Sequence, residues 1–246
     1  MALIEELSRQ GNTLFKYRSS LPIPFAIVGI IMYLYHIHFL HKEENSLTFE
    51  IGCLIVGLIG QGIRAITLGH TPKGTSGRNT TVQVAEKLNT KGMYSIMRNP
   101  LYLGNYFMWF SLIIFIDIHW FSIFYIMCFW IYYERIIFAE ENFLRKKYGE
   151  PYVKWTMKTP IFFPRFYGWK KPSLPFSLKN VLKREYSGFF ALFFCFSIFN
   201  IAENIVRQEH HYLDTFWIYA ILVSGFISLT LKILKKYTKK LTVTGR

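Results

Sequence analysis

The chain has 246 residues, of which 52% are apolar, 19% are aromatic and only 18% are charged. An ordinary soluble domain carries about a quarter charged residues. Here the charges cluster between long apolar runs, and the net charge is +14. This pattern excludes a disordered chain and indicates a membrane protein. The three cysteines lie inside apolar runs without CxxC spacing, so they predict neither a disulfide framework nor a zinc site.

Six apolar stretches have the length that about 30 Å of hydrocarbon demands at about 1.5 Å per helical residue. A short turn at Asp117 separates the third and fourth, which predicts an antiparallel helical hairpin. The first twenty residues hold no continuous apolar run and predict an amphipathic lead-in without a cleaved signal peptide. The sequence thus predicts an all-α polytopic membrane protein with about six transmembrane helices, at residues 21–40, 47–68, 101–117, 120–138, 188–205 and 212–234.

The positive residues of the connections predict the orientation. The two tails and the two long loops together hold 25 Lys and Arg, whereas the three short loops hold only Lys42 and Arg207. Both termini and both long loops should therefore be cytoplasmic. Topology and anionic lipid headgroups account for most of the +14 charge, so we expect no nucleic-acid partner.

We divide the chain into three regions. Residues 1–70 hold the lead-in and the first two spans, residues 71–165 hold the functional core, and residues 166–246 hold the last two spans with a basic tail. The two long cytoplasmic segments bracket the hairpin, and loops of this kind commonly carry function.

The first of these segments ends with LNTKGMYSIMRNPLYLGNY, residues 88–106. Asn99 suits a helix N-cap, Pro100 suits the first helical position, and Gly104 permits close packing with a neighbour or a ligand. A capped transmembrane helix with an interfacial Tyr102 and a snorkelling Arg98 would explain this motif without any catalysis.

That interpretation leaves four charges at the base of the adjoining span unexplained. They are Glu134, Arg135, Glu140 and Glu141. Charged residues this close to the hydrocarbon of the bilayer are energetically costly and usually face a cavity or a partner. A polar pocket at the cytoplasmic foot of the hairpin would account for all four.

These residues resemble a known superfamily. RNPLYLG at 98–104, preceded by GMYS and followed after the hairpin by EExxL at 140–144, YGEPYxxW and FFP, resembles the integral-membrane isoprenylcysteine carboxyl methyltransferases and phospholipid methyltransferases. The resemblance covers roughly residues 50–165. It implies a cytoplasmic S-adenosylmethionine site and a lipid substrate that enters from the bilayer.

The resemblance also implies roles for individual residues. Arg98, Arg135 and Glu141 are the catalytic candidates, of which Arg135 lies about one position from the substrate-side arginine of the pattern. A helix that begins at Pro100 would favour the carboxylate of the cofactor, and Glu140 could accept hydrogen bonds from its ammonium or hydroxyl groups. The cofactor-binding candidates are Leu88, Asn89, Tyr94, Asn99, Pro100, Leu101, Tyr102, Gly104 and Glu140.

One residue departs from the usual RHPxYxG pattern, because Asn99 stands where histidine is usual. Asparagine cannot act as a general base, and an anionic oxygen acceptor needs none. A phosphate monoester, with a second pKa of about 6, is largely dianionic at neutral pH. Asn99 therefore favours a phosphate or a carboxylate as the methyl acceptor.

The loop of residues 71–80, TPKGTSGRNT, points the same way. Lys73 and Arg78 lie among small hydroxyl residues and glycines, and Arg64 lies at the foot of the second span, so these three are our substrate-binding candidates for a phosphate headgroup. A solvated turn that follows the positive-inside rule is the alternative. The run resembles the bacterial branch that includes lipid A 1-phosphate methyltransferases, and it implies a bacterial inner membrane.

Other functions remain as alternatives. A carboxyl or phospholipid N-methyltransferase belongs to the same superfamily, and a sterol-type reductase would use NADPH on a related hairpin. A transporter should place ionisable residues near the middle of the membrane, whereas here they collect at one foot.

His36, His38 and His41 have no carboxylate or cysteine beside them, so we predict no metal. Asn200, Glu203 and Asn204 are expected to cap and solvate a helix end.

Overall fold

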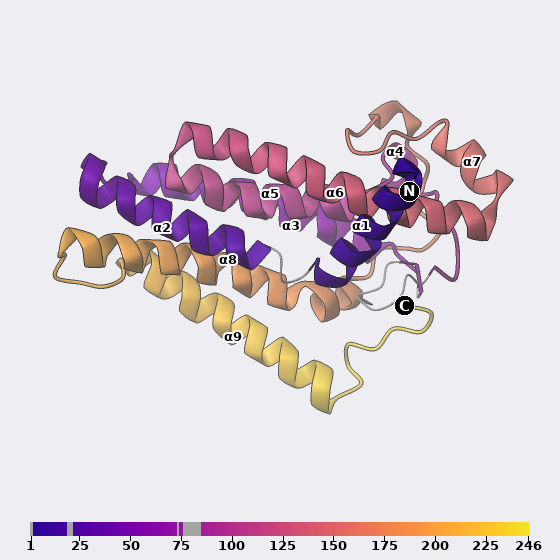
Figure 1. Cartoon of the computed structure of the whole chain (residues 1–246). Coiled ribbons are helices and arrows are strands. Elements are labelled where there is room, and N and C mark those ends of the chain that lie inside the picture. Colours follow the sequence, from indigo (N-terminus) through magenta and orange to yellow (C-terminus); the bar gives the residue numbers. More distant parts are fainter. Residues whose placement is uncertain (1, 19–21, 73, 76–84) are drawn as a thin grey trace.

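The computed structural model describes residues 2–18, 22–72, 74–75 and 85–246, which form helices and no strand. Figure 1 shows the long helices running alongside one another, with α1 crossing them obliquely near one end. The elements are α1 (Leu3–Tyr17), α2 (Pro22–Leu40), α3 (Leu47–Gly69), α4 (Met93–Ile96), α5 (Pro100–Ile116), α6 (His119–Tyr148), α7 (Glu150–Thr156), the short 3₁₀ helix η1 (Phe166–Gly168), α8 (Leu178–Arg207) and α9 (Thr215–Tyr237).

The prediction of an all-α polytopic membrane protein is confirmed. Within the described part of the chain, α2, α3, α6, α8 and α9 are long and apolar enough to cross a membrane. The sixth expected span is α5, which is equally apolar in character but has only 17 residues. Its hairpin with α6 turns at Asp117, whose left-handed backbone (φ 59°) ends α5 and lets α6 begin two residues later.

Two helices extend well beyond the apolar stretches that predicted them. α6 continues ten residues past the expected end of its span, to Tyr148, and α8 begins at Leu178, ten residues before its expected start. Hydropathy marks the part of a helix that lies in hydrocarbon, whereas charged residues with good helix propensity continue the same helix into water. These extensions carry Glu140 and Glu185.

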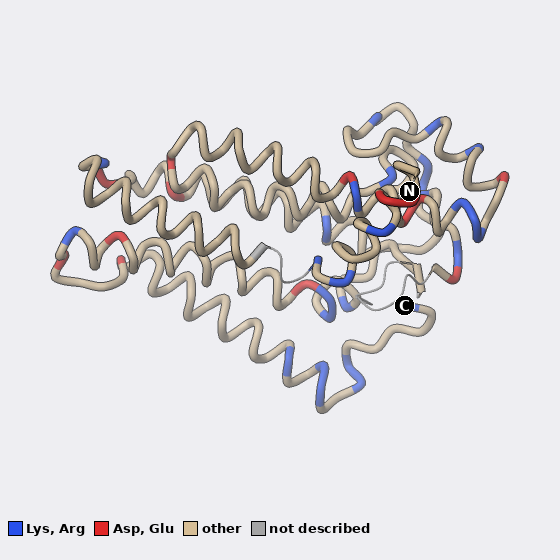
Figure 2. Tube along the Cα trace, viewed as in Figure 1, with Lys and Arg blue, Asp and Glu red and all other residues tan. Residues whose placement is uncertain are grey.

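We call the end of the bundle that holds both termini, α4 and α7 the site end, and the opposite end the far end. In Figure 1 both chain termini lie at the site end. Figure 2 shows that most charged residues lie at the two ends, with the basic residues concentrated at the site end, and that the middle of the bundle is almost free of charge. The arrangement agrees with a membrane crossing by the uncharged middle.

The far end is held by a buried polar network. The Tyr33 hydroxyl donates to Glu203 Oε2 at 2.6 Å, and Arg207 Nε donates to Glu203 Oε1 at 2.9 Å. Trp217 Nε1 donates to Glu50 Oε2 at 2.8 Å. The expectation that Glu203 solvates a helix end is wrong, because only 1% of this residue is exposed. Asn200 and Asn204 are buried there as well. These bonds connect α2 with α8 and α3 with α9.

Candidate active site

Two segments that are far apart in sequence are tied together at the site end. Arg98 N donates to Pro160 O at 2.8 Å, so the loop before α5 is bonded to the loop after α7. The Trp155 indole Nε1 donates to Tyr94 O at 3.1 Å. These bonds bring the two motifs to one place.

Behind these loops lies a cavity of about 680 Å³, bounded by α1, α3, α5, α6 and α8. Pockets of about 300–1,000 Å³ commonly hold small ligands and cofactors. Apolar side chains of α5 and α8, including Trp109 and Leu192, line the part that extends toward the far end. The arginine, glutamate, amide and tyrosine side chains that line it are Arg18, Arg64, Tyr94, Arg98, Asn99, Tyr102, Asn105, Tyr133, Glu140, Arg184 and Glu185.

Most of the predicted cofactor residues meet in this cavity. The Tyr102 hydroxyl of α5 donates to Glu140 Oε2 of α6 at 2.9 Å, which joins the two sides of the hairpin. The N-terminus of α5 opens onto the same space and favours a negatively charged group there. Leu88 and Asn89 do not line the cavity; Asn89 Oδ1 accepts from Lys91 N at 3.3 Å within its own loop. The predicted residues that do line it are Tyr94, Asn99, Pro100, Leu101, Tyr102 and Glu140.

Asn99 occupies the N-cap position of α5 but makes no capping hydrogen bond. Its Nδ2 instead donates to Ile161 O at 3.1 Å. The side chain therefore connects the helix start to the loop after α7. The capping role expected from the sequence is wrong, although the helix begins where it was predicted.

Gly104 lies at the crossing of α3 and α5. A Cβ at this position would lie 2.4 Å from Arg64 Cγ and 2.8 Å from Gly60 O. The absence of a side chain thus allows the two helices to approach closely and leaves room for the Arg64 side chain. Gly104 packs beside the cavity and is not among the residues that line it.

The three catalytic candidates have different surroundings. Arg98 lines the cavity and forms an ion pair with Glu141, with 2.8 Å between Nη1 and Oε1. Its Nε is buried without a hydrogen-bond partner in the described part of the chain. Arg135 does not line the cavity; it pairs with Glu134 at 2.7 Å, and its carbonyl oxygen lies against Gly11 of α1.

Arg64 is the one substrate-binding candidate that the structure describes, since Lys73 and Arg78 lie outside the described residues. Arg64 Nε and Nη2 donate to the two carboxylate oxygens of Glu185, at 2.7 and 2.8 Å. Its Nη1 donates to Asn105 Oδ1 at 2.6 Å. The guanidinium is thereby fixed in the cavity wall by α8 and α5.

Helices α1 and α8 also contribute to this site, and the sequence did not predict their contribution. Phe15 and Arg18 come from the end of α1, and Arg184 and Glu185 come from the start of α8. No local pattern identifies them, because they reach the cavity only through packing of distant helices. The pair of opposite charges just before the fifth apolar stretch was the one available signal.

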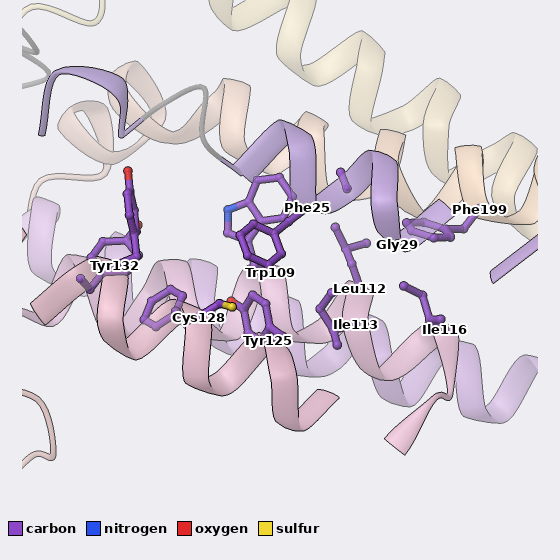
Figure 3. A pocket seen from close by; sticks show the side chains of 13 residues that line it. Phe25, Gly29, Trp109, Leu112, Ile113, Ile116, Tyr125, Cys128, Tyr132 and Phe199 are labelled. Atoms are coloured by element: carbon purple, nitrogen blue, oxygen red, sulfur yellow. The ribbon is translucent and has the colours of Figure 1, made fainter. Parts of the chain in front are cut away.

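A second, apolar pocket adjoins the cavity. Figure 3 shows it among α2, α5 and α6, with Phe25, Trp109, Tyr125 and Phe199 around it. Trp109, Leu112 and Tyr133 line both spaces. The polar cavity and the apolar pocket therefore share part of their walls inside the bundle. Among the described residues, no group of three His, Cys, Asp or Glu could hold a metal ion.

Comparison with known proteins identifies one family. Residues 51–151 match the model of the family described as phospholipid methyltransferase. No curated protein and no solved structure matches the chain. The matched segment includes most of α3, the first motif, the hairpin and both carboxylates of the EExxL motif, whereas α1, α2, α8 and α9 lie outside it. Residues 51–151 of this integral membrane protein thus match the phospholipid methyltransferase family, and this match is consistent with the superfamily of isoprenylcysteine carboxyl and phospholipid methyltransferases.

Proposed function

We propose that this protein transfers a methyl group from S-adenosylmethionine to an anionic oxygen of a membrane lipid. One observation carries the proposal: the polar cavity that holds Glu140 and the arginines adjoins an apolar pocket inside the bundle, with Trp109, Leu112 and Tyr133 lining both. A cofactor from water and a lipid from the bilayer could meet in such a space. The family match supports methyl transfer as the reaction.

The described residues fit the cofactor. Glu140 offers a carboxylate inside the cavity, and the Tyr102 hydroxyl fixes one of its oxygens. This carboxylate suits an ammonium or ribose hydroxyl, and the N-terminus of α5 suits a carboxylate. When bound, S-adenosylmethionine supplies a methyl group on a positively charged sulfur, and its transfer to an oxygen anion requires no proton acceptor.

The chain itself supplies position and desolvation. The tyrosines and aromatic residues of α5 and α6 exclude water from the cavity wall, and this strengthens charge interactions inside it. No histidine lines the part of the cavity that the structure describes, and Asn99 cannot accept a proton. Both features favour an acceptor that is already ionised, for which positioning supplies most of the catalysis.

Our specific proposal for the acceptor is the 1-phosphate of lipid A, with the site facing the cytoplasm at a bacterial inner membrane. The resemblance of the loop at 71–80 supports lipid A, and the excess of basic residues at the site end supports the orientation. Arg64, Lys73 and Arg78 are the proposed headgroup contacts. The apolar pocket beside Trp109 would contact the hydrocarbon next to the headgroup.

The test offers the purified protein matched lipids with and without a terminal phosphate, each with methyl-labelled cofactor. We expect label on lipid A that carries the 1-phosphate and none on the same lipid without it. Phosphatidylethanolamine serves as the aminolipid control. Equal labelling of the aminolipid would reject the phosphate acceptor in favour of N-methylation, and heat of binding with NADPH alone would reject methyl transfer.

A further inference from the structure

Helix α8 lies outside the matched family segment, yet its second and third turns form part of the cavity wall. Arg184, Glu185, Ser187 and Gly188 all line it. Figure 2 shows charged residues of both signs at this end of α8. A pair of accessory transmembrane helices would need no charges facing the active-site cavity. The position of these residues therefore calls for a functional explanation.

Glu185 fixes one side chain in particular. Both of its oxygens accept from Arg64, and Gln61 Nε2 donates to Oε2 at 2.9 Å. Only 6% of the Glu185 side chain is exposed, against 19% of the Arg64 side chain. Three of the five N–H donors of Arg64 are used by Glu185 and Asn105. Glu185 is thus the more buried partner of the pair and determines how the Arg64 guanidinium is presented to the cavity.

A second guanidinium lines the same cavity. Arg184 and Arg64 both line the cavity with Tyr94, and both act on the Tyr94 hydroxyl by their charge. Burial and the charge of Glu140 nevertheless keep the Tyr94 pKa above its ordinary value, so this hydroxyl remains a hydrogen-bond donor. Arg64, Arg184 and Glu185 together carry one net positive charge. Two guanidinium groups and a phenol are suited to an oxyanion.

We propose that the start of α8 completes the acceptor site, with Arg64 and Arg184 binding the phosphate of the lipid and Glu185 orienting Arg64 as a positioning residue. The proposal rests on the proposed function for its choice of acceptor and extends it to a helix outside the family segment. Replacing a buried ion pair by apolar residues is often neutral or stabilising. Stability alone therefore does not explain why Arg64 and Glu185 are paired here.

The pair can be tested by binding of phosphatidic acid, with diacylglycerol of the same chains as the phosphate-free match. We expect Glu185→Gln to weaken phosphatidic acid binding by about tenfold, as expected for a misaligned charge-assisted contact. Arg64→Gln and Arg184→Gln should weaken it by a similar factor. Adding Glu185→Gln to Arg64→Gln should change binding by less than about twofold, since Glu185 acts through Arg64.

A matched control comes from the same helix. Glu203 is also a buried α8 carboxylate paired with an arginine, but it lies at the far end. Glu203→Gln should lower thermal stability and leave lipid binding unchanged. If Glu185→Gln does not fold, Glu185→Asp keeps the charge and shifts the carboxylate, and it should fold and still bind phosphatidic acid more weakly.

A different result is expected if Glu185 does not position Arg64. If Glu185 only neutralised Arg64, its removal would add one net positive charge and tighten phosphate binding. Tighter or unchanged binding, weakening that persists in the Arg64→Gln background, or equal wild-type binding of both lipids would overturn the inference. Methyl transfer is measured separately on the wild type. Its absence would contradict the proposed function, whereas the binding series would still decide the role of Glu185.

Discussion

Glu140 and Glu141 are adjacent in sequence, but α6 turns them toward different partners. Glu140 accepts from Tyr102 in the cavity, whereas Glu141 pairs with Arg98 and does not line it. Successive helical residues point about 100° apart, so such a separation follows from the helix itself. What sequence could not provide was which of the two faces α5.

This difference predicts unequal effects of the same substitution. Glu140→Gln should weaken binding of S-adenosylhomocysteine by about tenfold or more, because hydrogen bonds to a charged group contribute about 1.5–3 kcal/mol. Glu141→Gln is the matched control and should change cofactor affinity much less, while it weakens the pairing with Arg98. Calorimetry on both variants measures the effect. Loss of binding in Glu141→Gln alone would reverse the assignment.

A second prediction for a single residue concerns Asn99. Asn99→Ala removes the bond from Nδ2 to Ile161 O, which should lower stability by about 1 kcal/mol, the usual value for one hydrogen bond. The pH dependence of the rate should be the same in wild type and variant, because Asn99 does not titrate. Thermal unfolding and pH–rate profiles from pH 6 to 8 test both parts. A changed profile would show that Asn99 influences a titrating group.

At the scale of elements, the close contact of α3 and α5 determines where Arg64 lies. Their backbones meet at Gly60 and Gly104, so the Arg64 side chain passes Gly104 to reach the cavity. The sequence indicated that Gly104 permits close packing, but the partner helix became known only from the structure. The sequence around a glycine in a helix does not indicate which other helix packs against it.

Gly104→Ala tests this contact. The new Cβ would overlap Arg64 Cγ and Gly60 O, and overpacking of this kind costs about 1–3 kcal/mol. We expect lower thermal stability together with weaker acceptor binding, because Arg64 must move. Gly62→Ala on α3 is the control: no atom lies within 4 Å of its Cβ position, and alanine favours a helix by about 1 kcal/mol. Equal destabilisation by both would contradict a specific contact at Gly104.

The two ends of the molecule differ in their chemistry. The sequence predicts the six apolar stretches, the hairpin and the presence of both termini at one end, because these features depend on hydropathy and charge along the chain. The extensions of α6 and α8 were not predicted, and neither was the buried network at Glu203, because distant packing creates them. The site end therefore combines local motifs that sequence reveals with the α8 wall that it does not.

The far end should behave as a structural unit that is independent of the reaction. Asp214 precedes α9 and accepts hydrogen bonds from Asn200 Nδ2 at 2.7 Å and Asn204 Nδ2 at 3.0 Å, and it lies 2.9 Å from His211 Nε2. Partial burial would raise the Asp214 pKa, but the bonds from Asn200, Asn204 and His211 outweigh it and lower the pKa below its ordinary value of 3.8. The ionised form is thus favoured by folding.

A carboxyl whose pKa is lowered by folding stabilises the protein above its unfolded pKa, and this contribution is lost as the pH falls through the folded pKa. We therefore expect the thermal stability of the wild type to decrease below about pH 4. Asp214→Asn should be less stable than the wild type at pH 7 by about 1 kcal/mol, and its stability should depend less on pH in acid. That loss corresponds to about 2–4 °C in Tm for a chain of this size. Unfolding scans of both proteins from pH 7 to pH 3 measure the difference. Because Asp214 lies at the end opposite the cavity, binding of S-adenosylhomocysteine at pH 7 should be equal in the two proteins; a weaker variant would show that the far end is coupled to the site.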